Sequence, residues 1–157
     1  MANTYTQIYL QFVFAVKGRQ NLIRDEFRDE LHKYITGIIQ NRKQKLIAIN
    51  SMPDHIHIFV GFGTTITIAD LIHDVKIAST EFIKSKGWLD KFSWQNGYGA
   101  FSYSRSHINA VTKYILNQQK HHKRKTFKEE YIEFLEKFKI EYNDKYLFEW
   151  IDNFKTN

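Results

Sequence analysis

The sequence contains no cysteine and only one proline among its 157 residues. The absence of cysteine excludes disulfide bonds and thiolate zinc sites, and it is typical of proteins in a reducing compartment. We therefore expect a cytoplasmic protein. Only seven glycines are present, and no Ser-rich or repeated tract suggests a linker or a low-complexity segment. We therefore expect one domain over residues 1–157.

Long apolar runs are also missing from the chain. No stretch approaches the roughly 20 apolar residues that a membrane-spanning helix needs, and the N-terminus lacks the pattern of a signal peptide. Hydrophobic residues still make up 43% of the sequence and aromatic residues 16%, which is enough to bury a core. These features predict a protein with its own core and no membrane partner.

The charge of the chain is unevenly distributed. The net charge is +6 and the isoelectric point is near 9.4. Residues 1–128 hold 19 basic and 9 acidic side chains, whereas residues 129–157 hold 4 and 8. Much of the excess lies in Lys120-His121-His122-Lys123-Arg124-Lys125. A basic body is the electrostatic footprint of a nucleic-acid binder, although basic runs also occur at ordinary helix ends.

The pattern of apolar residues predicts the order of strands and helices. Residues 6–16 alternate, with apolar side chains at every even position from 8 to 16, so one face of this strand should be core and part of the other wet. Helical periodicity follows from an Asn21 cap to about residue 41, and again after Thr67. Residues 46–50 and 55–60 read as strands, and Asn96-Gly97 within residues 92–103 indicates a hairpin.

Strand, helix, strand, strand, helix, strand is the order of a ferredoxin-like fold. We therefore expect an α+β protein, ferredoxin-like and RRM-like, with the order βαββαβ, one antiparallel sheet and helices on one face. Two further segments follow, a helix over about residues 106–121 and a short acidic, aromatic-rich helical tail over about residues 126–157.

Two histidines share one face of the third predicted strand. His55 and His57 flank Ile56, and alternating side chains place both imidazoles on the same face about 6.6 Å apart. They can converge on one cation. Because the apolar residues 56, 58 and 60 supply the core face, the histidines should point outward from the open face of the sheet.

Polar and titratable residues gather along one edge of the predicted helix over residues 106–121. At 100° per residue, His107, Tyr114, Gln118 and His121 fall close together beside an apolar stripe. Tyr114 and Gln118 are one turn apart, so a helix lying across the sheet can bring a phenol and an amide close to the two imidazoles. A tyrosine bordering an apolar stripe is otherwise a packing residue with a wet hydroxyl.

Together these segments resemble the single-tyrosine HUH transposases of the IS200 type of insertion sequence. The resemblance includes residues 52–59, the segment over residues 94–102 and the segment over residues 114–122. It implies cleavage and rejoining of single-stranded DNA with hairpin ends through a 5′-phosphotyrosine intermediate. By the same resemblance, Tyr114 is the nucleophile, and His55, His57 and Gln118 bind a divalent metal.

The expected metal is Mg²⁺ in use, with Mn²⁺ able to substitute and to bind more tightly, because imidazole ligands suit manganese better than magnesium. No general base is assigned, although His107 and His121 share the edge of the helix with Tyr114 and are candidates for proton transfer.

Candidate DNA contacts are basic and aromatic. Lys120, Lys123, Arg124 and Lys125 are expected to follow phosphates, and Trp94 and Tyr98, with Tyr9 and Phe101 as further candidates, to stack on unpaired bases. Core packing is the alternative for each aromatic residue. Two other functions stay open, a non-cleaving, domesticated single-stranded nucleic-acid-binding protein of the same fold and an HUH replication or transfer nickase. The resemblance also implies a homodimer in which the tyrosine helix completes the neighbour's active site.

Overall fold

The computed structural model describes residues 3–17 and 23–147. The ferredoxin-like part consists of β1 (Tyr9–Ala15), α1 (Asp25–Asn41), β2 (Lys45–Met52), β3 (His55–Gly61), α2 (Ile68–Ser85) and β4 (Gly99–Tyr103). It is followed by η1 (Arg105–His107), α3 (Ile108–Leu116), α4 (Gln118–His121), α5 (Phe127–Lys137) and η2 (Asp144–Tyr146). The predicted α+β class and the βαββαβ order are confirmed.

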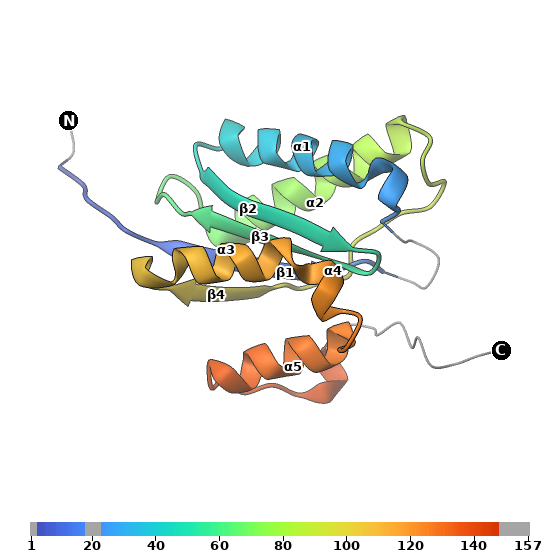
Figure 1. Cartoon of the computed structure of the whole chain (residues 1–157). Helices are drawn as coiled ribbons and strands as arrows, with labels where there is room; N and C mark the ends of the chain where they lie inside the picture. Colours follow the sequence, from blue (N-terminus) through green and yellow to red (C-terminus); the bar gives the residue numbers. More distant parts are fainter. Residues whose placement is uncertain (1–2, 18–22, 148–157) are drawn as a thin grey trace.

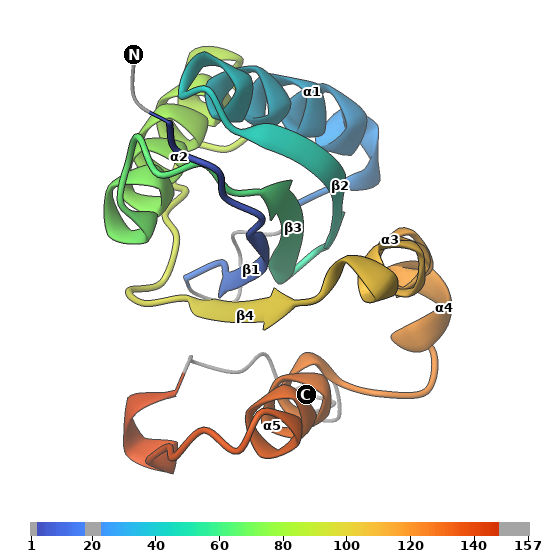
Figure 2. The same ribbon diagram turned by 90° about the vertical axis from the view of Figure 1, so that its left-hand side faces the viewer.

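The four strands form one antiparallel sheet in the order β2-β3-β1-β4. Figures 1 and 2 show α1 and α2 on one face of this sheet and α3, α4 and α5 toward the opposite face. In the register of the two central strands, Val13 of β1 pairs with His57 of β3. The histidine strand therefore lies inside the sheet, where a side chain on either face can be covered.

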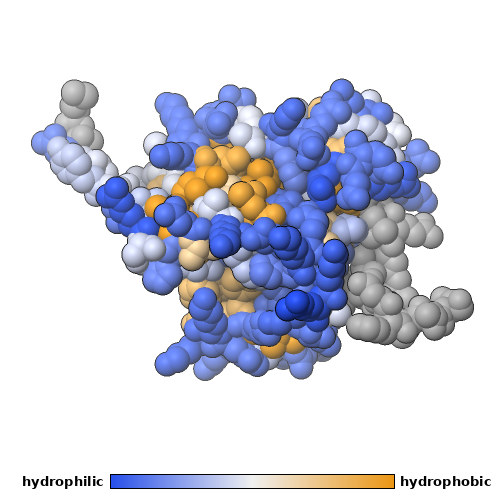
Figure 3. Space-filling view, viewed as in Figure 1, coloured by the Kyte–Doolittle hydropathy of each residue, from blue (hydrophilic) through white to orange (hydrophobic). Residues whose placement is uncertain are grey.

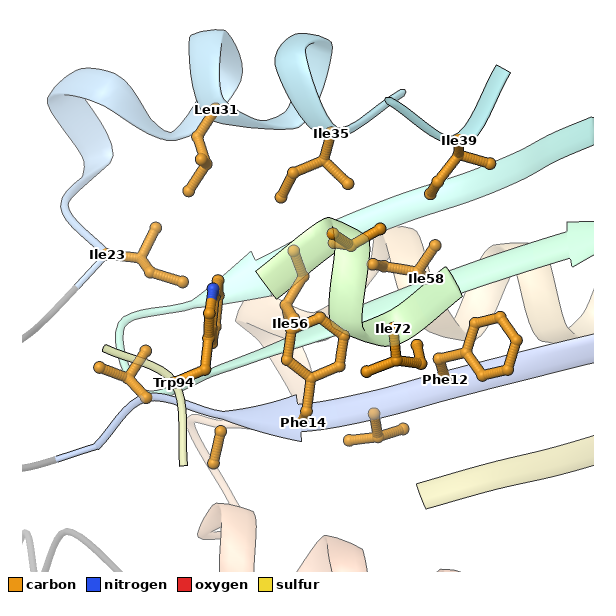
Figure 4. Packing of buried hydrophobic residues seen from close by; sticks show 14 of the residues in the cluster. Phe12, Phe14, Ile23, Leu31, Ile35, Ile39, Ile56, Ile58, Ile72 and Trp94 are labelled. Carbon is orange, nitrogen blue, oxygen red and sulfur yellow. The ribbon is translucent and has the colours of Figure 1, made fainter. Parts of the chain in front are cut away.

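The main core fills the space between the sheet and the pair α1 and α2. Phe12 and Phe14 of β1 and Ile56 and Ile58 of β3 are at most 1% exposed, and Figure 4 shows them facing the apolar side of α1. These are the even positions that the alternation predicts to be core. Burial of this face fixes the odd positions, including both histidines, on the other face.

Of the two helix caps predicted from the sequence, the structure confirms the one at Thr67. Thr67 caps α2 as predicted, because its side chain accepts a hydrogen bond from the backbone N–H of Asp70 at 3.1 Å. The first helix begins at Asp25, and its N-cap is Arg24 without a side-chain hydrogen bond. Asn21, the predicted cap, lies outside the described residues.

The predicted hairpin around Asn96-Gly97 is wrong. Residues 92–98 form no strand, and only an isolated bridge joins Trp94 to Val16, while β4 pairs with β1. The chain bends at Asn96, and Gly97 has a φ of 89°, which favours glycine. This bend leads from a core-filling loop into the edge strand β4 and does not connect two paired strands.

The face of the sheet that was predicted to be open is covered. Phe101 of β4 stacks on Phe134 of α5 with ring centroids 5.0 Å apart, and Phe59 of β3 packs with Val111 and Ile115 of α3. As a result Gln11, predicted to be partly wet, is 0% exposed. The expectation of outward-pointing, solvent-exposed histidines fails for the same reason, because the C-terminal helices lie on top of them.

The helix predicted over residues 106–121 is divided. It starts as the η1 turn, runs as α3 to Leu116, and resumes as α4 at Gln118. Asn117 lies between the two helices with φ −99° and ψ 19°. This break redirects Gln118 and the residues after it toward the sheet. Among the described residues, no helix combines the length and the apolar character needed to cross a bilayer.

Candidate active site

His55 and His57 project side by side from β3 into the space under the C-terminal helices. Both are 0% exposed, and their ring centroids are 5.1 Å apart. The ring of His55 stacks on Phe127 at 3.9 Å, and the ring of His57 lies 6.2 Å from that of Phe134. Residues of α5 thus hold both imidazoles in fixed orientations and exclude water from them.

A hydrogen bond to an acceptor fixes the tautomer of each imidazole. Nδ1 of His55 donates to Oδ1 of Asp54 at 2.7 Å. Nδ1 of His57 donates to Oε1 of Gln11 at 2.7 Å, since Gln11 uses its Nε2 to donate to the Tyr103 hydroxyl at 2.9 Å. With the hydrogen on Nδ1, Nε2 of each ring faces the interior of the site, as in histidine ligands of metals.

Gln118 and His122 enter the same space from α4 and the turn that follows it. Gln118 is 0% exposed, and its Oε1 lies 3.3 Å from Nε2 of His55 and 3.0 Å from Nε2 of His122. The His122 Nδ1 donates to the backbone carbonyl of Lys125 at 2.9 Å. Its Nε2 therefore also faces inward, which makes His122 a third imidazole of the site.

Glu130 of α5 completes the cluster. Its Oε1 lies 3.1 Å from Nε2 of His57, 3.2 Å from Nε2 of His122 and 3.4 Å from Nε2 of His55. Its Oε2 accepts a hydrogen bond from Nε2 of Gln118 at 3.0 Å. One carboxylate on a helix that packs over the sheet thus contacts all three imidazoles.

Tyr114 of α3 borders this cluster within the same chain. Its hydroxyl donates a hydrogen bond to Oε2 of Glu130, and its ring centroid is 6.1 Å from that of His57. Burial, and after it the negative charge of Glu130, raise the pKa of the phenol. A cavity of about 310 Å³ opens beside the phenol between α3 and α5, so a second molecule can approach Tyr114 from that side.

The two candidate proton carriers near Tyr114 differ in position. His121 stacks on the tyrosine ring with centroids 4.6 Å apart. His107 lines the cavity, but its Nδ1 is engaged by the hydroxyl of Ser104 at 2.7 Å. Among the described side chains, Glu130 is the one whose oxygen accepts the phenolic hydrogen.

The charges in the cluster are strongly coupled. Burial alone would lower the pKa of His55, but hydrogen bonds to Asp54 and Glu130 outweigh it and raise the pKa to about 9. Burial lowers the pKa of His57. Burial would raise the pKa of Glu130, but His57, His122 and His55 together hold it well below its usual range. A positive charge between Glu130 and the imidazoles therefore stabilises the cluster.

The donor atoms of the cluster fit a cation. His55, His122 and Glu130 offer one ligand atom each, and these atoms lie within 4.8 Å of one another. His57 and Gln118 add an imidazole nitrogen and an amide oxygen directed at the same place. Electron pairs of nitrogen and oxygen that converge without a hydrogen between them repel, and either protons or a metal ion relieve that repulsion.

The sequence also matches a known family. The family model described as "Transposase IS200 like" matches residues 4–118, a range that includes the complete sheet and the residues His55, His57, Tyr114 and Gln118. The chain belongs to the IS200-like transposase family. The resemblance proposed from the sequence is therefore confirmed at the level of the family.

Solved structures agree with this assignment at the level of the fold. A crystal structure of a candidate transposase from Deinococcus radiodurans R1 is 22% identical, with a TM-score of 0.61, and the match covers 75% of this chain and 95% of that one. A REP-associated tyrosine transposase bound to a REP hairpin is 15% identical, with a TM-score of 0.57 and coverage of 78% and 73%. No curated protein matches the sequence.

The predicted DNA contacts of this IS200-like transposase divide into exposed and buried residues. Lys120, Lys123 and Arg124 are exposed at and after α4, and Tyr98 is 37% exposed. Lys125 is exposed too, but its Nζ pairs with Glu133 at 2.7 Å. Figure 3 shows hydrophilic side chains over α4 and α5 on the face turned toward the viewer.

Two of the aromatic candidates are core residues. Trp94 is 7% exposed, donates from Nε1 to the Ser79 hydroxyl at 2.9 Å and packs edge-on against Phe14, as Figure 4 also shows. Phe101 is 1% exposed beneath α5. The prediction that Trp94 stacks on a DNA base is therefore wrong, because the ring would have to leave the core, and the same holds for Phe101.

Sequence reasoning missed Glu130, His122 and Gln11. Gln11 lies on an ordinary alternating strand. His122 lies in the basic run and at the end of the family-like segment over residues 114–122, and neither pattern marks it as a ligand. Glu130 did carry a signal, because it falls on the apolar side of α5 with Phe127, Tyr131 and Phe134. A carboxylate among buried aromatic positions is costly unless it is paired.

Proposed function

We propose that this protein is a DNA transposase that cleaves and rejoins single-stranded DNA, with Tyr114 as its nucleophile. The observation that carries the proposal is the position of the Tyr114 phenol at the edge of the cluster of His55, His57 and Gln118. In the resting structure the Glu130 carboxylate lies between the phenol and the imidazoles, and a phosphate that takes its place would contact both. This arrangement suits phosphoryl transfer to a side-chain oxygen.

In the proposed reaction the phenolic oxygen attacks the scissile phosphorus and the bond to the 3′ oxygen breaks. The phenol loses its proton, and the leaving 3′ oxygen takes one up. The products are a 5′-phosphotyrosine and a free 3′-hydroxyl. Because one phosphodiester bond replaces another, the hydroxyl of a second strand can reverse the step and join new ends.

The proposed metal site comprises His55, His57 and Gln118, with Mg²⁺ in use and Mn²⁺ able to substitute. When bound, the divalent ion would supply Lewis-acid stabilisation of charge on the phosphate. Asp54 and Gln11 orient the two imidazoles through Nδ1, and the covering helix α5 excludes water. The resting site holds the phenol neutral, since burial and Glu130 both raise the pKa of Tyr114.

The proposed substrate is single-stranded DNA with hairpin ends. The REP-associated tyrosine transposase that shares this fold is described bound to a REP hairpin. In this chain Lys120, Lys123 and Arg124 present positive charge next to the site, and the exposed Tyr98 is available for stacking.

We also propose that the protein forms a homodimer. Leu116 on α3 is 57% exposed, and Figure 3 shows an apolar area over β2 and the adjoining part of α3, bordered by hydrophilic residues. Such an area favours a protein contact. Because Tyr114 already reaches the histidines of its own chain, dimerisation need not supply a tyrosine to the neighbour. Light scattering that shows a monomer with and without DNA would contradict the dimer.

The decisive experiment is the capture of a covalent protein–DNA adduct. We expect the protein, incubated with a hairpin-containing single strand and Mg²⁺ or Mn²⁺, to yield an adduct that survives a denaturing gel. Tyr114→Phe should abolish it. The matched control is Tyr34→Phe, on α1 at the opposite face of the sheet, which should leave it unchanged.

Two results of the adduct experiment, and a third from an assay of strand joining, would contradict the proposal. DNA binding without an adduct would indicate a non-cleaving nucleic-acid-binding protein of the same fold. An adduct that persists in Tyr114→Phe would assign the nucleophile to another residue. A nickase would form the adduct but would fail to join the bound 5′ end to a second strand.

A further inference from the structure

The inward-facing donor atoms outnumber the three ligands of the proposed metal site. Beside His55, His57 and Gln118, the structure directs Nε2 of His122 and Oε1 of Glu130 at the same place. Glu130 is 3% exposed and the side chain of His122 is 8% exposed. Neither residue was identified from the sequence, and both follow the segment matched by the family model, which ends at residue 118.

The hydrogen bonds around His122 favour the same tautomer, with the hydrogen on Nδ1, as in His55 and His57. Its Nδ1 donates to a backbone carbonyl that can only accept, so Nε2 carries an electron pair when the ring is neutral. The amide of Gln118 is oriented too, because its nitrogen donates to Oε2 of Glu130 and its oxygen turns toward the imidazoles. Each ligand atom thus has a partner that keeps it directed inward.

We propose that His122 and Glu130 are additional ligands of the divalent cation that binds His55, His57 and Gln118. The inference rests on the proposed metal site and extends it to three imidazole nitrogens and two oxygens. Mg²⁺ prefers oxygen ligands and retained water, whereas imidazoles suit first-row transition ions. The complete set therefore favours Mn²⁺ or Zn²⁺ over Mg²⁺ in binding.

The extended ligand set links metal binding to the position of α5. Glu130 is carried by a helix whose neighbouring residues Phe127 and Phe134 pack on His55 and Phe101. An ion bound partly by Glu130 binds the state with α5 in place more tightly than a state with α5 displaced. By linkage, the bound ion therefore stabilises the arrangement in which α5 covers the sheet.

Binding of Mn²⁺ to the full-length protein without DNA tests the proposal. The loss of the signal of free Mn²⁺ in electron paramagnetic resonance gives the dissociation constant. We expect Glu130→Gln and His122→Asn each to weaken binding at least about tenfold, the lower end of what even indirect partners of metal ligands contribute. Glu129→Gln, the exposed neighbour on α5, and His73→Asn, exposed on α2, are the matched controls and should bind as the wild type does.

A measurement on the wild type keeps the test independent of how the variants fold. Long-range ¹H–¹⁵N spectra of histidine side chains report coordination at each ring nitrogen, and diamagnetic Zn²⁺ serves as the probe. We expect Zn²⁺ to shift Nε2 of His55, His57 and His122 together. A His122 signal that stays unchanged while the other two move, or Glu130→Gln binding Mn²⁺ like Glu129→Gln, would overturn the corresponding ligand.

Failure of this proposal is distinguishable from failure of the proposed function. Unchanged Mn²⁺ affinity in both variants would remove His122 and Glu130 from the ligand set while the adduct of Tyr114 with DNA still formed. Metal binding with all the expected ligands but no adduct would instead leave the ligand set intact and refute the transposase reaction.

Discussion

The phenol of Tyr114 donates a hydrogen bond to the carboxylate of Glu130, which lies sixteen residues further along the chain. This contact joins α3 to α5 across the cluster of imidazoles. It also couples the proposed nucleophile to the group that contacts all three histidines. A displacement of α5 will therefore change the environment of the Tyr114 phenol.

Tyr114→Phe should measurably destabilise the protein as well as abolish the adduct. A hydrogen bond to a charged acceptor contributes about 1.5–3 kcal/mol, and here Gln118 continues to donate to the same oxygen. We therefore expect a loss of about 1.5 kcal/mol in the free energy of unfolding, measured by urea denaturation. Tyr34→Phe, whose ring stacks on Phe82, should change it by less than about 0.5 kcal/mol. Equal effects of the two substitutions would contradict a buried hydrogen bond at Tyr114.

Asp54→Asn should weaken metal binding without removing a ligand. The carboxylate of Asp54 accepts the Nδ1 hydrogen of His55 at 2.7 Å and favours its inward-facing tautomer. Loss of such an orienting partner reduces metal affinity by about 10–100-fold. The dissociation constant for Mn²⁺ measures the effect, and the exposed Asp90→Asn is the control. An affinity within twofold of the wild type would show that the orientation of His55 does not depend on Asp54.

Gly99→Ala should displace α5 from the sheet. A Cβ at Gly99 would lie 2.8 Å from the hydroxyl of Tyr131 and 2.9 Å from Cε2 of Phe101. Overpacking of this kind costs about 1–3 kcal/mol, and we expect a lower midpoint of urea denaturation. Gly37→Ala in α1 is the opposite control, because its Cβ would meet nothing within 4 Å and the substitution should stabilise the helix by about 0.5–1 kcal/mol. A neutral Gly99→Ala would mean that α5 does not pack tightly there.

Most of the fold could be predicted because its signals are local. Alternation in residues 8–16 fixed the faces of β1, and Thr67 marked the start of α2. The hairpin prediction failed because an Asn-Gly pair defines a turn but not the partner of the strand that follows it. The break at Asn117 was also missed, because no glycine or proline follows Leu116 to mark the end of a helix.

The site was predictable in part for the same reason. The spacing of His55 and His57, and of Tyr114 and Gln118, is visible within single elements. Gln11 and Glu130 join them only when β1 and α5 pack against β3, and no local pattern encodes that proximity. The expectation of an open sheet face likewise ignored α5, although its apolar stripe required a partner surface.

Lys123→Ala and Arg124→Ala should each weaken binding of single-stranded DNA and reduce its salt dependence. Both side chains are exposed after α4, and each phosphate contact adds about 0.7 to the slope of log K against log salt concentration. Lys125→Ala should have a smaller effect, because Glu133 already neutralises it. Fluorescence anisotropy at several salt concentrations gives the slopes, with Lys33→Ala on α1 as the control. Slopes equal to that of the control would remove this basic segment from the DNA interface.

His32 should make the stability of the protein depend on pH below neutrality. Its Nε2 lies 2.7 Å from the hydroxyl of Ser51. Burial, and then the charge of Arg28, lower its pKa from 6.5 to about 4 against an opposing effect of Asp29. Because the folded pKa is the lower one, the unfolded chain binds the proton more readily between these values. The contribution of His32 to the free energy of unfolding is therefore fully present above pH 6.5 and is lost as the pH falls toward 4.

The His32→Asn variant isolates this contribution, since an amide can keep a hydrogen bond to Ser51 without titrating. At about 1.4 kcal/mol per pKa unit, reduced for partial solvent exposure, we expect the wild type to lose about 1–2 kcal/mol more than His32→Asn between pH 7 and pH 4.5. Urea denaturation at each pH measures both proteins, and the exposed His73→Asn should follow the wild type. Parallel curves for the wild type and His32→Asn would show that His32 titrates alike in the folded and unfolded chains, and the loss of stability in acid would then belong to the carboxylates.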